Sequence, residues 1–288
     1  MKSSQKMLII NADDFNLTEG VNRAILQCHD RGIVTSTTIL INRPLKRAWI
    51  RELKKRKDLG LGLHLNVTLG KPVSKPAQIA SLLSEAGKFK AFNRVLSLRA
   101  KRSNLKCKIA TPAENHGGLA MTTIPGLPQC LELLKEWEAQ ILKFKKIFGR
   151  LPTHLDSHHQ LHDHPFFLSG LSTLSKRYKL PVRRSKLLGP RPSRGQAPLG
   201  RYTTDYLFGD LDPEKYWKAS KLKACLKKLP AGISEIMCHP GYHDQDLDKI
   251  SSFTSGRASE LELFSSPTLR KKIRASGIIL THYGLCYT

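Results

Sequence analysis

Five histidines and two aspartates lie in one twelve-residue stretch, which reads Thr-His-Leu-Asp-Ser-His-His-Gln-Leu-His-Asp-His over 153–164. Neutral imidazole and carboxylate groups suit a zinc-type cation, and a hydrolytic metal site uses about three protein ligands with one position open for water. A single histidine in such a stretch would more often belong to a solvated polar loop. So many histidines together favour part of a metal site that other segments complete, without showing which of them bind.

Two adjacent acids, Asp13 and Asp14, follow the apolar run of residues 7–10. The run predicts a short strand that is buried on both faces and ends where the acids begin. Burying two carboxylates is costly unless they are paired or bind a cation, so an exposed turn is the competing interpretation. On these residues alone, a cation site and an exposed turn have equal weight.

His64 and His239 are the other candidate groups. His64 alternates with leucines on a predicted strand over 61–67, where it shares one face with Gly62 and Asn66. A lone histidine on a strand is usually structural, but its small neighbours here leave room for a ligand. His239 follows another short apolar segment, and the proline and glycine after it predict a sharp turn.

The predicted strands and helices alternate along the chain, which is the pattern of a parallel α/β fold. Apolar runs predict strands over 7–10, 34–41, 61–67, 153–156, 180–184, 234–237 and 277–283. Helical spacing predicts helices from the N-cap Thr18 to about Gly32 and over 48–55, 130–148, 165–178, 216–229 and 259–274. In barrel-like α/β folds the carboxyl ends of the strands meet at one face, so the separate polar groups can form one site.

Two further segments complete this outline. The helix over 130–148 is expected to bury an apolar stripe, formed by Leu131, Leu134, Trp137, Ile141 and Phe144. Residues 70–127 carry clusters of proline, glycine, lysine and serine, which predict a loop-rich insertion with short helices. A second loop is expected over 189–200.

The composition is that of a globular protein, long enough for one large α/β domain or two small ones. The apolar run at 7–10 is too short for a signal-peptide core, and no run approaches the length of a membrane span, so we expect a cytoplasmic protein. The six cysteines include no Cys-x-x-Cys pair, which argues against a zinc ribbon and a disulfide framework. We expect them to be reduced.

The net charge of +25 is the unusual feature of the composition. A strongly basic balance favours anionic partners such as nucleic acid, acidic polysaccharide or a membrane surface. The basic residues are spread over many segments and form no nucleic-acid-binding motif, so the charge alone is weak evidence.

Four motifs resemble the YdjC family of carbohydrate deacetylases. They are Asn-Ala-Asp-Asp-Phe at 11–15, Gly-Leu-His-Leu at 62–65, Pro-Thr-His-Leu-Asp-Ser-His at 152–158 and Cys-His-Pro-Gly-Tyr at 238–242. The resemblance extends over essentially the whole chain. It implies a single domain over 1–288, folded as an irregular, TIM-like (β/α) barrel, that uses one divalent metal ion, magnesium or zinc, to remove acetyl groups from N-acetylated sugars.

The family motifs also imply roles for individual residues. Asp14, His64 and His158 would hold the metal, with His158 chosen over its neighbouring histidines. Asp13 would be the general base, and His239 a general acid or a partner of the oxyanion. A metal acidifies its water, Asp13 can accept the proton, and the departing amine then needs a proton back.

Further residues of the histidine-rich stretch, His154, Asp156 and His162, are expected to contact the substrate. The chain departs from the family pattern at two places. Asn16 stands where the family usually has glycine, and asparagine tolerates a positive φ better than most residues. Gln160 stands where the family commonly has histidine, which would weaken the site if that position supports the metal.

Three functions follow, in decreasing order of support. The first is a metal-dependent hydrolase that acts on the acetamido group of an amino sugar. The second is a sugar-binding or regulatory protein of the same fold with a weakened site, prompted by Gln160. The third is a polyanion-binding protein, prompted by charge alone. The sequence predicts an N-acetylated sugar partner and no specific nucleic acid, and it leaves a homo-oligomer open.

Overall fold

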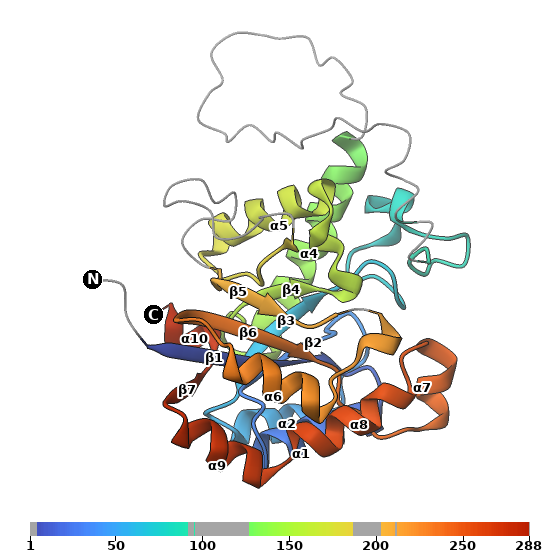
Figure 1. Cartoon of the computed structure of the whole chain (residues 1–288). Coiled ribbons are helices and arrows are strands. Elements are labelled where there is room, and N and C mark those ends of the chain that lie inside the picture. Colours follow the sequence, from blue (N-terminus) through green and yellow to red (C-terminus); the bar gives the residue numbers. More distant parts are fainter. Residues whose placement is uncertain (1–4, 92–94, 96–126, 187–202, 211, 288) are drawn as a thin grey trace, which may run out of the picture.

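The computed structural model describes residues 5–91, 95, 127–186, 203–210 and 212–287, and a parallel sheet forms its centre (Figure 1). The strands are β1 (Lys6–Phe15), β2 (Ser36–Ile39), β3 (Gly60–Leu65), β4 (Leu155–Ser157), β5 (Tyr206–Phe208), β6 (Gly232–Cys238) and β7 (Ile278–Thr281). Their order is β4-β3-β2-β1-β6-β5. One edge of β1 pairs with β6, and the other pairs first with β7 and then with β2.

Isolated bridges connect the two ends of the sheet. Leu155 of β4 forms a parallel bridge with Val182, and Val182 forms another with Thr203, shortly before β5. The sheet is therefore curled into a deformed barrel, which confirms the predicted fold class. The segment 180–184 contributes only these two isolated bridges of Val182 and is not the regular strand that its composition predicted.

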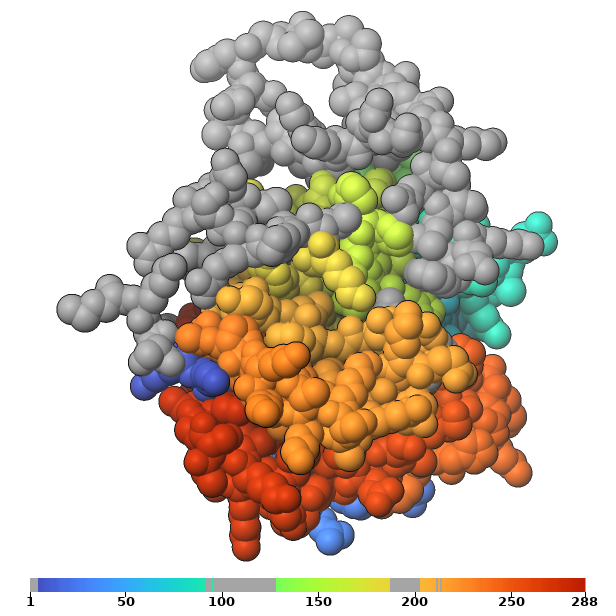
Figure 2. Space-filling model, in the orientation of Figure 1, coloured from blue at the N-terminus to red at the C-terminus, as the bar shows by residue number. Residues whose placement is uncertain are grey.

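Helices cover the sheet on both sides (Figure 1). They are α1 (Glu19–Asp30), α2 (Arg47–Lys55), α4 (Leu127–Phe148), α5 (Pro165–Tyr178), α6 (Ala219–Lys227), α7 (Gln245–Ile250), α8 (Ser255–Phe264), α9 (Pro267–Ala275) and α10 (Tyr283–Cys286). In the view of Figure 1, α4 and α5 lie above the sheet, while α1, α2, α6, α8 and α9 lie below it. On the face shown in Figure 2, the C-terminal third of the chain forms most of the lower surface.

Several helix predictions need correction. The predicted helix over 259–274 is two helices, because Pro267 begins a new helix and cannot continue the previous one. Leu131 of α4 is 49% exposed and does not belong to the apolar stripe, whereas the other four predicted members are buried. The short elements α7 and β5 were not predicted. Thr18 does cap α1, since its hydroxyl accepts a hydrogen bond from Val21 N.

The loop-rich segment 70–127 contains two short 3₁₀ helices in its described part, η1 (Pro76–Gln78) and η2 (Ala80–Leu82). Residues 96–126 and the predicted loop 189–200 lie outside the described residues. No helix in the described part of the chain is long and apolar enough to cross a membrane.

The cysteines follow the expectation of reduced thiols only in part. Cys28, Cys225, Cys238 and Cys286 are free, whereas Cys130 is disulfide-bonded and contradicts that expectation.

Candidate active site

The first strand continues beyond its apolar run and carries Asp13 and Asp14 into the interior. Its pairing with β2 shifts register between Ala12 and Phe15, as in a β-bulge, and Asp14 has a φ of 70°. Regular alternation would point adjacent side chains to opposite faces, but the bulge brings both carboxylates to the same pocket. Both are buried, which excludes the exposed turn.

Asn16 follows the bulge and has a φ of 77°. Its side-chain amide donates to Leu40 O at 3.0 Å and to Arg43 O at 3.3 Å. Asn16 thus adopts a left-handed backbone conformation, and glycine is not required at this position, as expected.

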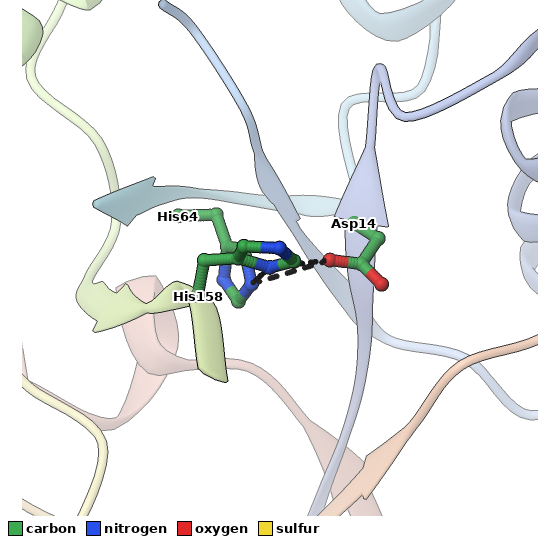
Figure 3. Close-up of side chains that lie close together, drawn as sticks. All are labelled: Asp14, His64 and His158. Atoms are coloured by element: carbon green, nitrogen blue, oxygen red, sulfur yellow. Dashed lines mark hydrogen bonds and ion pairs between the residues drawn. The ribbon is translucent and has the colours of Figure 1, made fainter. Parts of the chain in front are cut away.

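Asp14, His64 and His158 converge from three segments of the barrel (Figure 3). Asp14 lies near the end of β1, His64 on β3, and His158 directly after β4. Asp14 Oδ1 lies 3.1 Å from His158 Nδ1 and 3.4 Å from His64 Nε2, and the two ring nitrogens lie 3.3 Å apart. The structure therefore brings together the three residues implied as metal ligands.

This Asp14–His64–His158 triangle fits a divalent cation. Ligand atoms at 2.0–2.2 Å from a tetrahedral metal lie about 3.3–3.6 Å apart, close to the sides of the triangle. Asp14 Oδ1 is buried and has no hydrogen-bond partner among the residues that the structure describes. Because buried polar atoms are normally satisfied, this oxygen points to a ligand, and two imidazoles beside it suit a cation.

Asp156 holds His64 from behind. The two residues are register partners on β3 and β4, and Asp156 Oδ1 lies 2.7 Å from His64 Nδ1. The other oxygen of Asp156 accepts a hydrogen bond from Thr38 Oγ1 at 2.9 Å. A carboxylate on one ring nitrogen directs the other nitrogen, Nε2, toward the triangle and strengthens it as a ligand.

Burial alone would lower the pKa of His64, but the neighbouring carboxylates of Asp156, Asp14 and Asp13 raise it to about 10. Ion pairs in this region join four carboxyl groups to two guanidinium groups, namely those of Asp13, Asp14, Asp156, Glu235, Arg183 and Arg257. The cluster therefore lacks positive charge, which a proton on His64 or a bound cation would supply.

Arg183 is fully buried and fixes Asp13. Its Nη1 and Nη2 donate to the two oxygens of Asp13, each at 2.6 Å. It also lies 3.0 Å from Asp156 and donates from Nε to Glu235 at 2.9 Å. Burial by itself raises the pKa of Asp13, but the charge and hydrogen bonds of Arg183 hold that pKa well below its usual range. Asp13 is therefore ionised at neutral pH.

Arg257 fixes Asp14 in a similar way. Its Nη2 donates to Asp14 Oδ2 at 2.6 Å, which leaves Oδ1 directed at the two histidines. Against the effect of burial, the charge of Arg257 lowers the pKa of Asp14 well below its usual range. Asp14 thus offers a charged, oriented oxygen to a cation.

A cavity of about 210 Å³ lies over the triangle and is lined by Asp13, Asp14, His64, His158 and His239, among others. His239 Nε2 lies 3.8 Å from Asp13 Oδ2, and its backbone N–H donates to Glu260. Burial lowers the pKa of His239 to about 4 despite the nearby aspartates, so its ring is neutral at neutral pH. Asp13, the Asp14–His64–His158 triangle and a neutral imidazole therefore share one pocket.

The profile of the YdjC-like protein family matches residues 7–275. The chain belongs to the YdjC-like family. A carbohydrate deacetylase of Geobacillus stearothermophilus is 31% identical over 276 residues, which is 96% of each chain. A chitooligosaccharide deacetylase of Yersinia enterocolitica is 29% identical over 284 residues, covering 98% of this chain and 100% of the relative. The resemblance stated from the four motifs is thereby confirmed.

A solved structure supports the same membership. It is that of an Enterococcus faecalis protein proposed to cleave cellobiose phosphate, with a TM-score of 0.73 and 30% identity. The match covers 99% of this chain and 100% of the other. The barrel of this YdjC-like protein is therefore shared with a relative over its full length.

Three residues expected to contact the sugar lie behind the pocket of this YdjC-like protein. His154, Asp156 and His162 have no exposed surface and do not line the cavity. The ring of His154 stacks on Tyr283 with centroids 4.1 Å apart, and His162 Nδ1 lies 2.6 Å from Ser157 Oγ. These contacts give the three residues supporting positions, and their contact with substrate stays a prediction.

The space beside Gly62 is not free for a ligand. A Cβ atom at this position would lie 2.3 Å from Cε1 of His154, so the missing side chain makes room for that imidazole. The expectation that Gly62 leaves room for a ligand is therefore wrong.

Replacing Gly62 by alanine is expected to lower the free energy of unfolding by about 1–3 kcal/mol, because the added methyl group would overpack His154. Urea denaturation measures this change. The matched control is Gly170→Ala in α5, where the nearest atom would be 3.4 Å away and alanine favours the helix. Wild-type stability of Gly62→Ala would contradict the prediction.

Sequence reasoning missed Arg183 and Arg257. Arg183 follows Val182 in an apolar segment, and Arg257 lies two residues before the predicted start of its helix. Both are among many arginines in a basic chain, and no local pattern marks a buried one. The only available signal was indirect, since buried aspartates require a cationic partner.

Proposed function

We propose that this protein is a metal-dependent hydrolase that removes acetyl groups from N-acetylated amino sugars. The observation that carries the proposal is the buried Asp14–His64–His158 triangle, which lies in one pocket with the ionised Asp13. Membership of a family whose relatives are named carbohydrate deacetylases supports the same reaction.

Asp14, His64 and His158 would hold the divalent cation. When bound there, such a cation would lower the pKa of water and stabilise negative charge on the acetamide oxygen. Asp156 and Arg257 support the ligands, since one orients His64 and the other fixes Asp14. Two imidazoles and one carboxylate suit zinc, and magnesium is the alternative.

Asp13 would act as the general base that accepts a proton from the attacking water. Its low pKa keeps it ionised, and Arg183 holds both of its oxygens in place. His239 is 3.8 Å from Asp13 and neutral, so it can receive a proton and deliver it to the departing amine. Hydrolysis thereby yields acetate and the free amino sugar.

The lining of the pocket argues for a neutral or cationic substrate. It contains four aspartates, Asp13, Asp14, Asp210 and Asp212, but one arginine, Arg257. Among the described residues, acidic groups thus outnumber basic ones in the lining, which gives no support to a polyanion as the substrate. A cavity of about 210 Å³ suits a single sugar unit.

Acetate release from a substrate panel tests the proposal. The panel would contain N-acetylglucosamine, its oligomers and lipid-linked amino sugars, together with zinc, magnesium or chelator. We expect acetate and free amine in equal amounts, and none with chelator. Cellobiose phosphate serves as the contrast, since its cleavage without any deacetylation would overturn the proposal. Sugar binding without acetate release would favour the binding-only alternative.

Binding of the metal at pH 7 is expected to release about one proton, because a metal ligand must be deprotonated and the pKa of His64 in the metal-free protein is about 10. His64 is protonated below that pKa, so metal affinity should rise with pH until about 10 and then level off. Calorimetry in two buffers of different ionisation enthalpy counts the protons. Proton-free binding at pH 7 would contradict this account of His64.

A further inference from the structure

Gln160 is a buried amide on the wall of the pocket, and its side chain lacks a hydrogen bond among the described residues. The residue is 2% exposed, and neither Oε1 nor Nε2 has a hydrogen-bond partner in the described part of the chain. Leaving a buried amide unsatisfied costs stability, and native proteins rarely accept this without a reason. Gln160 lines the cavity together with Asp14 and Arg257.

The backbone that carries the Gln160 amide has an energetically unfavourable conformation. His159 and Gln160 have φ values of 56° and 45°, a left-handed conformation that non-glycine residues rarely adopt. This turn begins directly after the metal-facing His158, and His159 Nδ1 lies 3.1 Å from Thr68 Oγ1. Two successive strained residues at a pocket wall are typical of a functional constraint.

We propose that Gln160 is a substrate-binding residue whose amide hydrogen-bonds a hydroxyl group of the sugar. The proposal rests on the proposed function, because it takes the occupant of the pocket to be an amino sugar. A primary amide has two N–H donors and a carbonyl acceptor, and a sugar hydroxyl both donates and accepts. Substrate in the pocket would therefore satisfy both the donor and the acceptor of a side chain that has no partner within the described ranges.

Gln140 provides a matched control for this residue. It is also a buried glutamine, but its amide is satisfied, since Oε1 accepts from Asn66 N and Nε2 donates to Asn66 O and Glu136. Gln140 does not line the pocket. Methionine is close to glutamine in shape and lacks its hydrogen-bonding groups. The substitution therefore removes hydrogen bonds within the protein at Gln140, and the proposed hydrogen bonds to the substrate at Gln160.

The experiment compares Gln160→Met, Gln140→Met and wild type in kcat/KM, metal affinity and melting temperature. We expect Gln160→Met to lower kcat/KM about tenfold or more, because two neutral hydrogen bonds to the substrate are lost. Metal affinity and melting temperature should be retained. Gln140→Met should lower the melting temperature. A monodeoxy substrate that lacks the contacted hydroxyl should be processed equally by wild type and Gln160→Met.

Two results would overturn the proposal for Gln160. One is an unchanged kcat/KM in Gln160→Met, and the other is a loss of metal affinity, which would place the amide on the metal. Failure of the proposed function is distinguishable, because wild type itself would then release no acetate from any substrate. In that case, calorimetric binding of N-acetylglucosamine oligomers tests the role of Gln160. The proposal is overturned if wild type does not bind them, or if wild type and Gln160→Met bind them with equal affinity.

Discussion

Acetate release by Asp13→Asn is expected to be about 10²–10⁴-fold slower than by wild type, the usual contribution of a general base. The amide keeps the shape of Asp13 but cannot accept the proton of water. Asp13 does not belong to the Asp14–His64–His158 triangle, so the variant should still bind one equivalent of metal. Steady-state kinetics and metal analysis of the same preparation measure the two quantities.

The same substitution at Asp246 is the control for this experiment, since that aspartate is exposed and its Oδ1 lies 3.1 Å from Lys249 Nζ, at the surface. It should leave acetate release unchanged. The melting temperature of Asp13→Asn must also be followed, because Arg183 loses one of its three buried carboxylate partners. A folded, metal-loaded Asp13→Asn enzyme with wild-type rate would show that another group is the base.

Replacing His158 by alanine should remove both the metal and the activity. The variant leaves two of the three ligands, so its metal affinity should fall by more than the roughly 10–100-fold that loss of a supporting residue costs. Asp156→Asn, which only weakens the support of His64, should stay within that smaller range. Calorimetric titration of chelator-treated protein with zinc measures both affinities.

His243→Ala is the matched control for the loss of a histidine. His243 is exposed and lies 2.9 Å from Asp248, outside the cavity. The His243→Ala variant should bind metal as tightly as wild type does. Wild-type metal affinity in His158→Ala would contradict the assignment of the triangle and return the choice to the other histidines of the stretch.

The alternation of strands and helices predicted a parallel α/β fold in which the strand ends that build the site converge, whereas the barrel was implied by the family resemblance. Asp14, His64 and His158 came from the family motifs, and the structure places their ligand atoms 3.1–3.4 Å from one another. The histidine-rich stretch alone could not single out His158. Which side chain points into the pocket depends on the 3₁₀ turn after β4, whose dihedral angles no local composition reveals.

Other features of the site depend on tertiary contacts. The bulge that turns Asp13 and Asp14 to one pocket arises from a register shift between β1 and β2, which alternation cannot show. Arg183 lies far from Asp13 in the sequence, and its burial can be inferred only from the carboxylates around it. Likewise, the space beside Gly62 could be assigned to His154 only when the two strands were placed side by side.

The most direct test of the metal site is a titration of chelator-treated wild-type protein with zinc or magnesium, in which bound metal and acetate release are measured in the same samples. Asp14, His64 and His158 are proposed as one ligand set, so the rate should rise in proportion to occupancy and reach its plateau at one bound ion per chain. Full acetate release from metal-free protein, or no release from protein that holds one ion in this site, would contradict the account.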